Sequence, residues 1–328
     1  MDTVRNTVLE VEGLCKSYGD KNILKNVSFS VEAGEVVGFL GPNGAGKSTT
    51  MNIITGYLSP TRGKVTVCGT DTLEAPRTAK SKIGYLPELP PLYFDMTVYE
   101  YLSFVFDLKK CELDKKRHIA ECMALVKITD VAHRIIKNLS KGYKQRVGVA
   151  QALIGDPDIL ILDEPTVGLD PAQIMEIRDV IRYIGKTKTI ILSTHILQEV
   201  TAVCDKVIII NRGRIMACDS LKNLESGSFD TYTLKVPAAS AGVAEAVRGC
   251  GVDIKPAASD EMGVHSYVLS CAKGEDVREK LFNAFVDAGI PMLEFAKTTK
   301  SIEDVFRQYT SDSVDIGVTG KKEREADK

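Results

Sequence analysis

The segment EVVGFLGPNGAGKS, residues 35–48, decides the fold of this chain. Its first six residues are Glu35 and a short apolar run that begins with two β-branched valines, which predicts a buried strand over residues 35–40. Residues 41–48 match the phosphate-loop pattern G-x-x-x-x-G-K-[ST], and a helical pattern follows them. A strand, a glycine loop and a helix in this order predict a nucleotide-binding α/β fold built on a mostly parallel sheet.

The glycine loop predicts ATP as the ligand and Mg²⁺ as its cofactor. Glycines let backbone N–H groups face the phosphates, and the helix that follows presents its positive end to them. Lys47 is expected to reach the β- and γ-phosphate oxygens, and the Ser48 hydroxyl to bind Mg²⁺. The sequence contains no NKxD motif, which would read guanine, so ATP is favoured over GTP. The loop residues expected to contact ATP are Gly41, Pro42, Asn43, Gly44, Ala45, Gly46, Lys47, Ser48 and Thr49.

A second apolar run, residues 159–162, leads directly into an acidic pair. Asp163 is placed to hold Mg²⁺ through water, and Glu164 to polarise the attacking water as a general base. Two further apolar runs, at residues 189–194 and 207–210, are predicted to be strands of the same sheet. Each strand ends where a candidate functional residue begins, as expected when a ligand binds at the carboxyl edge of a parallel sheet.

The octapeptide LSKGYKQR, residues 139–146, lies between the glycine loop and the acidic pair. Ser140 has the pattern of an N-cap for the amphipathic helix that follows. With the glycine loop, the acidic pair and His195 in this order, residues 8–220 resemble the ATP-binding-cassette (ABC) ATPases. The resemblance implies that Ser140 and Gly142 face a γ-phosphate held by Lys47 of a second subunit. The N–H groups and dipole of a helix N-terminus suit that anion.

The same resemblance implies roles for three more residues. Tyr18 matches the aromatic residue that stacks on adenine. Asp170 matches a loop residue that crosses the dimer interface, and it also has the pattern of an N-cap before Pro171. His195, which closes the run 189–194, matches the histidine that contacts the γ-phosphate. Lys47, Glu164 and His195 are therefore the expected catalytic residues.

Three departures from the commonest pattern of the family indicate a branch within it. Glu88 stands where most of these ATPases carry Gln, and it can coordinate Mg²⁺ or accept a hydrogen from water, although it lacks the amide donor. Lys141 and Tyr143 stand in place of Gly and Gln. These residues, together with residues 88–102, resemble the ABC-2 exporter subfamily, whose ATPase subunits often carry a C-terminal extension. Ser48, Glu88 and Asp163 are the expected Mg²⁺ ligands.

Changes of pattern along the chain predict three regions. Residues 1–225 are expected to form the ABC ATPase domain, with an inserted helical subdomain at about 88–155. Residues 226–311 show the order β-α-β-β-α-β, which suggests a small ferredoxin-like α+β domain. Its role as a ligand sensor or as a packing appendage stays open. Residues 312–328 are small, polar and charged, and are expected to be a disordered tail.

Helix ends and faces can also be predicted from the sequence. Thr97 and Glu100 have the spacing of a capping box, which places a helix start in the inserted subdomain. Ser301 and Asp304 have the same spacing before the last helix of the chain. A helix over residues 275–288 is expected to end at Gly289. Its apolar face is predicted to contain Val277, Leu281, Phe282, Phe285 and Val286.

Composition limits the functional classes. A net charge of −2 and a pI near 6.2 give no basic footprint for nucleic acid. The eight cysteines are scattered without a CxxC pair, which is typical of reduced cytosolic thiols. No apolar run approaches the ~18 residues of a membrane-spanning helix. We therefore expect the chain to meet a membrane only through a partner.

Together these patterns predict the ATP-binding and ATP-hydrolysing subunit of an ABC-2-type transporter. The expected partners are a second ATPase subunit and separate integral membrane permease subunits at the cytoplasmic face of the cell membrane, with no nucleic acid. A homodimer is expected, and a heterodimer stays open. The alternative is a non-transport ABC ATPase that acts mechanically on a ribosome or DNA complex. Such proteins commonly carry two cassettes or long coiled-coil insertions, and this sequence has neither.

Overall fold

The computed structural model describes residues 6–226, 229–259, 261–298 and 302–310. Its central layer is a six-stranded sheet with the order β10-β9-β3-β8-β7-β6. Neighbouring strands are parallel except at the β9–β10 edge, which is antiparallel. The predicted parallel sheet is thereby confirmed. Its strands are β3 (Val36–Leu40), β6 (Ile83–Leu86), β7 (Ile159–Asp163), β8 (Thr189–Thr194), β9 (Lys206–Asn211) and β10 (Arg214–Ser220).

A second, antiparallel sheet lies beside the first, and the sequence patterns had not separated the two. Its strand order is β2-β1-β4-β5. Helix α1 (Lys47–Ile54) packs between the two sheets, and its buried Met51 and Ile54 share one core with both. Each sheet therefore covers one side of the helix that follows the glycine loop. The strands are β1 (Thr7–Tyr18), β2 (Lys21–Glu32), β4 (Arg62–Val67) and β5 (Thr70–Asp71).

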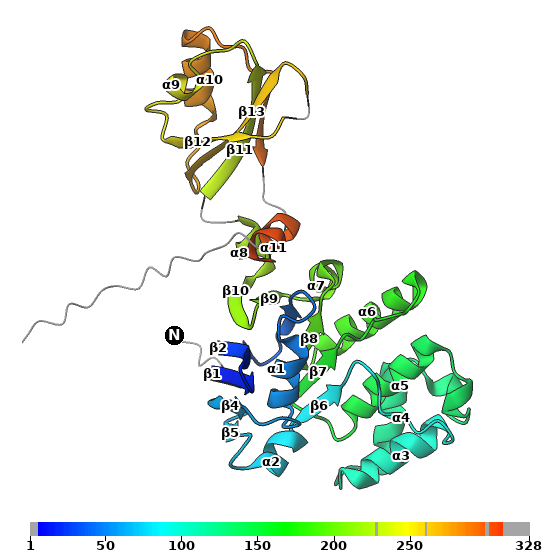
Figure 1. The fold of residues 1–328 in the computed structure, drawn as a ribbon. Helices are drawn as coiled ribbons and strands as arrows, with labels where there is room; N and C mark the ends of the chain where they lie inside the picture. The colour runs from blue at the N-terminus through cyan, green and yellow to red at the C-terminus, as the bar shows by residue number, and fades with distance from the viewer. Residues whose placement is uncertain (1–5, 227–228, 260, 299–301, 311–328) are drawn as a thin grey trace, which may run out of the picture.

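Helices cover the other face of the parallel sheet and form the inserted subdomain. In Figure 1, α3, α4 and α5 gather in one group at the lower right. The predicted capping box is present, because Thr97 accepts a hydrogen bond from the Glu100 backbone and donates its own backbone N–H to the Glu100 carboxylate. These helices are α3 (Val98–Leu108), α4 (Lys115–Leu125), α5 (Lys141–Leu153), α6 (Pro171–Gly185) and α7 (Leu197–Val203), with short 3₁₀ turns at Thr129–Val131 and Ile136–Asn138. Helix α2 (Pro76–Ser81) instead lies beside β5 and β6, and its Ala79 is buried in the core that contains α1.

The accessory domain has the predicted ferredoxin-like order. Its antiparallel sheet runs β12-β13-β11-β14, and its helices cover one face of that sheet. It has a hydrophobic core of its own, in which Tyr232, Leu234, Leu281 and Phe285 are buried. The elements are β11 (Phe229–Pro237), α9 (Val243–Ala246), β12 (Val252–Ala257), β13 (Val264–Ala272), α10 (Arg278–Asp287) and β14 (Glu294–Thr298).

Helix α10 corrects the predicted apolar face. Val277, Leu281 and Phe285 are buried, but Phe282 and Val286 are 55% and 61% exposed. A step of one residue turns a side chain by about 100° around a helix, so these two side chains leave the narrow stripe that meets the sheet. The helix also begins at Arg278 rather than at residue 275.

Two helices flank the accessory domain in the sequence and contact each other: α8 (Leu221–Ser226) and α11 (Ile302–Thr310). Ile302 and Val305 of α11 are buried in the core that the parallel sheet shares with the helices covering it. The last helix of the predicted accessory region therefore packs on the other domain. The predicted cap at Ser301 and the predicted tail at residues 312–328 lie outside the described residues. Among the described residues, no helix is both long and apolar enough to cross a membrane.

Phe285→Ala is expected to lower the free energy of unfolding of the accessory domain by about 3–5 kcal/mol, because it leaves a cavity in that domain's own core. Phe282→Ala, the matched control one turn away on the exposed face, should change it by no more than about 0.5 kcal/mol. Amide hydrogen exchange of β11 and β13 in the full chain measures both values. Equal effects of the two substitutions would contradict the observed helix face.

Candidate nucleotide-binding site

The glycine loop between β3 and α1 is packed too tightly for side chains at two of its glycines. A β-carbon on Gly41 would lie 2.3 Å from the carbonyl oxygen of Ile210. A β-carbon on Gly46 would lie 2.7 Å from the Leu24 side chain, and the φ of Gly46 is 110°, in the region that favours glycine. The backbone of the loop is therefore fixed against β2 and β9. Helix α1 begins at Lys47, and the first N–H groups of a helix have no partner within it, so they are available to an anion.

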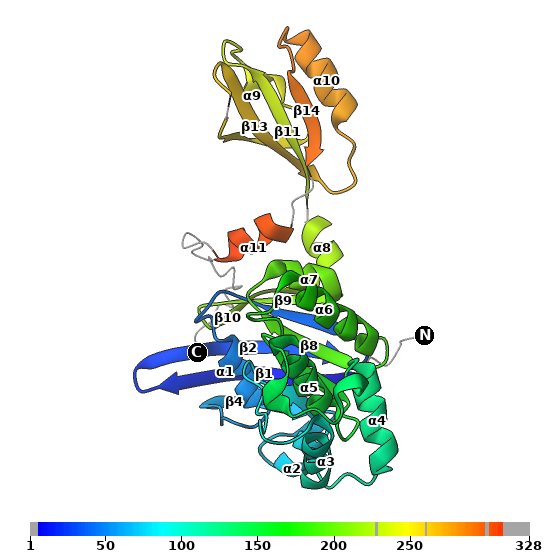
Figure 2. The ribbon, with the colours of Figure 1, turned by 90° about the vertical axis from the view of Figure 1, so that its right-hand side faces the viewer.

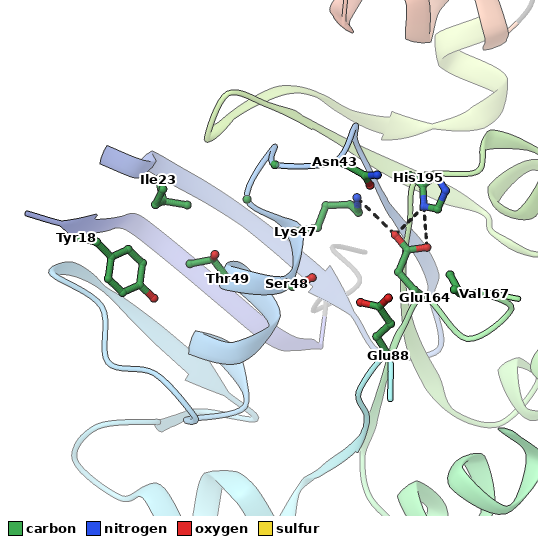
Figure 3. A pocket seen from close by; sticks show the side chains of 12 residues that line it. Tyr18, Ile23, Asn43, Lys47, Ser48, Thr49, Glu88, Glu164, Val167 and His195 are labelled. Carbon is green, nitrogen blue, oxygen red and sulfur yellow. Dashed lines mark hydrogen bonds and ion pairs between the residues drawn. The ribbon is translucent and has the colours of Figure 1, made fainter. Parts of the chain in front are cut away.

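Lys47 is the first residue of α1, and its side chain is only 6% exposed. Its Nζ donates a hydrogen bond to the carbonyl oxygen of Gly41 at 2.9 Å and lies 3.5 Å from Oε1 of Glu164. Figure 3 shows the side chain running from the loop toward Glu164. A buried ammonium held by these acceptors provides a fixed positive charge beside the loop.

The acidic pair stands at the end of β7, and both residues are buried. Burial raises the pKa of the Asp163 carboxyl. The hydroxyls of Ser193 and Ser48 oppose this rise, and the carboxylates of Glu164 and Glu88 add to it. Within the described part of the chain, Oδ1 of Asp163 is buried without a hydrogen-bond partner. A cation would satisfy this oxygen and offset the crowded negative charge. The hydroxyl of Ser48 and the carboxylate of Glu88 line the neighbouring pocket, so the donor set is all oxygen and suits Mg²⁺.

Glu164 is held by contacts with two strands and with His195. Its φ is 49°, a left-handed conformation that is uncommon for a non-glycine residue, and its N–H donates to the carbonyl oxygen of Ser193 at 2.8 Å. Nδ1 of His195 lies 3.0 Å from each carboxylate oxygen of Glu164. Nδ1 must be the donor, because an ionised carboxylate only accepts. The carboxylate is therefore oriented by Lys47 on one side and by His195 on the other.

A pocket of about 540 Å³ joins these residues to Tyr18. Figure 3 places Tyr18 and His195 at opposite ends, with the glycine loop between them. Tyr18 is 53% exposed, and the Lys16 ammonium lies 5.0 Å from the centroid of its ring. This elongated shape suits a base, a sugar and a phosphate chain in sequence. The lining residues are Tyr18, Ile23, Asn43, Gly44, Gly46, Lys47, Ser48, Thr49, Glu88, Glu164, Val167 and His195.

Ser140, Gly142 and Asp170 do not line this pocket. Ser140 is the N-cap of α5, where its Oγ accepts from the N–H of Tyr143, and Asp170 is the N-cap of α6. A β-carbon on Gly142 would meet the side chain of Gln173 in α6 at 2.9 Å, so the two helix starts lie together. Both N-cap predictions are confirmed. The three residues form a separate group, which we name the α5–α6 surface.

The unusual residues of α5 make contacts within the chain. The hydroxyl of Tyr143 donates to the carboxylate of Asp130 at 3.0 Å, and the guanidinium of Arg146 lies 4.1 Å from the Tyr143 ring centroid. The ammonium of Lys141 packs so closely on Gly168 that a β-carbon there would meet it at 2.0 Å. These two residues thus tie the start of α5 to the segments on either side of it.

Comparison with known proteins identifies the family. A family model described as ABC transporter matches residues 24–167. The chain is 35% identical over 306 residues to the uncharacterized ABC transporter ATP-binding protein YxlF of Bacillus subtilis (strain 168), covering 91% of this chain and 98% of that protein. The chain belongs to the family of ABC transporter ATP-binding proteins.

Two further ABC proteins show the range of the similarity. The Nod factor export ATP-binding protein I of Rhizobium johnstonii is 38% identical over 213 residues, which cover 64% of this chain and 68% of that protein. A dimeric structure of the ATP-binding cassette MJ0796 in a post-hydrolysis state, bound to ADP and Pi, superposes with a TM-score of 0.59 and 26% identity. The superposition covers 66% of this chain and 99% of the MJ0796 chain. The present chain is accordingly an ABC-type ATPase with exporter-type relatives.

One buried residue beside the nucleotide pocket, Glu199, was not predicted from the sequence. Glu199, in α7, is 1% exposed and accepts hydrogen bonds from the hydroxyls of Thr166 and Thr194. Oγ1 of Thr194 also lies 3.4 Å from Oε2 of Glu164. Glu199 thus joins the segment after the acidic pair to the end of β8. A glutamate four residues after His195 has no pattern of its own, and only its burial among threonine hydroxyls distinguishes it.

Asp163→Asn is expected to stabilise the nucleotide-free chain at neutral pH. The folded-state pKa of Asp163 lies above its unfolded value, so the stability contributed by protonating it is fully present below the unfolded pKa and is lost as pH rises through the folded pKa. The neutral amide removes this penalty. The stability gained by the variant should therefore grow as pH rises from the ordinary aspartate pKa to the raised pKa, and level off above it.

Urea denaturation at several pH values from about 4 to 8, without nucleotide or divalent cations, measures this difference. Asp253→Asn, which changes an exposed carboxylate in β12, is the matched control and should show no comparable increase. A stability difference for Asp163→Asn that does not vary with pH would contradict the raised pKa.

Proposed function

We propose that this chain is the ATP-binding and ATP-hydrolysing subunit of an ABC-2-type exporter and that it works as a dimer. The observation that carries the proposal is the separation of the pocket from the α5–α6 surface within one chain. The pocket holds Tyr18, Lys47, Glu164 and His195. Ser140 and Gly142 stand at a helix N-terminus outside it, which is a favourable place for a second subunit's phosphate. Two chains placed head to tail would complete two sites.

The binding roles follow from the positions of the residues in the pocket. Tyr18 stacks on adenine, and the backbone N–H groups of the loop bind the phosphates. Lys47 exchanges its contact with Glu164 for the β- and γ-phosphates. Ser48, Glu88 and Asp163 hold Mg²⁺, which neutralises phosphate charge when bound. Asp163 supplies the strongest support for the cation site, because its buried oxygen has no other partner among the described residues.

Glu164 is the general base for hydrolysis. Its carboxylate accepts the proton of the attacking water as the water's oxygen attacks the γ-phosphorus, and the bond to the bridging oxygen breaks to release ADP and Pi. His195 keeps that carboxylate in place and stabilises negative charge on the γ-phosphate. Ser140 of the opposing subunit contributes from the other side. Asp170 lies beside Ser140 at the start of α6, which suits a role at the same interface.

The exporter assignment rests on the relatives and on the surface around Glu88. The similar Rhizobium protein is named for export. A groove of about 410 Å³ lies between residues 88–94 and the start of α5, and Leu89 within it is 83% exposed. We assign this groove and the helical subdomain to the contact with membrane permease subunits. That contact would place the chain at the cytoplasmic face of the cell membrane, with residues 1–225 as the ATPase domain.

Glu164→Gln is expected to lower steady-state ATP hydrolysis by about 10²- to 10⁴-fold, because the amide cannot take a proton from water. ATP binding should survive, and the ATP-bound dimer should accumulate. Phosphate release and size-exclusion chromatography with ATP and Mg²⁺ measure these effects. Glu245→Gln, which changes an exposed glutamate of the accessory domain, serves as control. Hydrolysis by Glu164→Gln at a near-normal rate would rule out the assigned base.

Ser140→Arg is expected to abolish hydrolysis even though the pocket of the same chain is intact, because the added side chain occupies the place of the opposing phosphate. Lys47→Ala should also be inactive. In a mixture of the two variants, each mixed dimer contains one composite site with a normal Lys47 and a normal Ser140. Hydrolysis by the mixture above that of either variant alone is the expected result, and its absence would contradict the shared site.

A further inference from the structure

The last helix of the described chain belongs physically to the ATPase domain. In α11, Ile302 and Val305 are 3% and 6% exposed, and they lie in the same core as Val207 and Ile209 of β9. Figures 1 and 2 both show α11 beside α8, between the accessory domain and the parallel sheet. The chain thus leaves the ATPase domain, forms the accessory domain and returns to dock on the sheet.

A side-chain hydrogen bond joins the end of α11 to the end of β9. Nδ2 of Asn211, the last residue of β9, donates to the carbonyl oxygen of Tyr309 at 3.0 Å. Tyr309 lies in the last described turn of α11. The Asn211 amide therefore joins this turn to the end of β9.

The turn that follows Asn211 contacts the glycine loop directly. The N–H of Gly213 donates to the carbonyl oxygen of Ala45 at 3.0 Å, and the carbonyl of Gly213 accepts from the N–H of Lys25 at 2.8 Å. A β-carbon on Gly213 would lie 2.0 Å from the carbonyl oxygen of Ile23. Ile23 is one of the residues that line the nucleotide pocket. The turn is therefore packed against both the phosphate loop and β2. A shift of Asn211 would move the backbone that supports Ala45.

We propose that α11 is a positioning element of the nucleotide site, acting through the Asn211 amide and the β9–β10 turn on the phosphate loop. The proposal deepens the proposed function, because it assumes that ATP binds at this loop. The helix acts on binding rather than on the chemical step. Glu164 and His195 follow β7 and β8, whereas the turn contacts the loop that receives the phosphates.

The accessory domain is not itself part of this connection. Its first and last strands, β11 and β14, pair side by side, and the Thr231 hydroxyl donates to the carbonyl oxygen of Thr298 at 2.6 Å. The chain therefore enters and leaves the accessory domain at neighbouring positions. Excision of the domain leaves two nearby ends that a short linker can join, with α11 retained. The effect of the helix can thus be separated from that of the domain.

Asn211→Ala in the full chain is the first test. It should raise the ATP dissociation constant by about 2- to 10-fold, the range expected from loss of one hydrogen bond, and leave kcat at saturating ATP within about twofold. Amide hydrogen exchange in residues 41–48 should become faster. Thr310→Ala is the matched control, because it removes a hydrogen bond to Phe306 in the same helical turn without touching Asn211. It should change neither quantity.

Two shortened chains form the second test. Replacement of residues 229–298 by a short Gly-Ser linker keeps α11 and should bind ATP as tightly as the full chain. Termination after residue 226 removes α11 and should weaken ATP binding at least as much as Asn211→Ala. Circular dichroism and thermal unfolding establish that each variant is folded.

Each outcome separates the alternatives. Unchanged ATP affinity and unchanged exchange in Asn211→Ala overturn the proposal. Equal losses in the two shortened chains also overturn it, because they assign the effect to the accessory domain. If the parent chain itself fails to bind ATP, the proposed function fails instead.

Discussion

The carbonyl oxygen of Ile210 lies only 2.3 Å from the position that a β-carbon on Gly41 would take, and this close backbone contact fixes the phosphate loop against β9. Because the strand end touches the loop directly, the loop cannot move without moving β9. Helix α1 starts at Lys47 and is buried between two sheets, so it fixes the other end of the loop. The phosphate-binding backbone is therefore set by the packing of three elements rather than by the loop alone.

Charge is concentrated and buried around this backbone. Lys47, Asp163 and Glu164 are each less than a tenth exposed. Burial of charge is costly unless partners compensate, and here the compensation is uneven. Glu164 has Lys47 and His195, whereas Oδ1 of Asp163 has no partner among the described residues. Burial and the neighbouring carboxylates of Glu164 and Glu88 raise the pKa of Asp163, because each of them disfavours its charged form.

The two domains meet through short helices at the edge of the sheet. The accessory domain has a core of its own, and α11 after it contributes to the core of the ATPase domain. This arrangement makes the C-terminus of the described chain part of the support of β9. The contact between α11 and β9 is specific, because Ile302 and Val305 are buried there and Asn211 adds one directed hydrogen bond.

The sequence by itself determined the parallel sheet, the glycine loop, the acidic pair and the βαββαβ order, because each of these is a local pattern. A phosphate loop requires glycines at fixed spacing. Strands and helices are recognised from the spacing of apolar residues over a short stretch of sequence. Phe282 and Phe285 could not be separated, because both are apolar and only docking on the sheet decides which one is buried. The partners of Glu164, the isolated oxygen of Asp163 and the bridge at Glu199 also required the tertiary structure. Those contacts join residues far apart in the chain, and no local pattern records which side chains the packing of distant strands brings within hydrogen-bond distance.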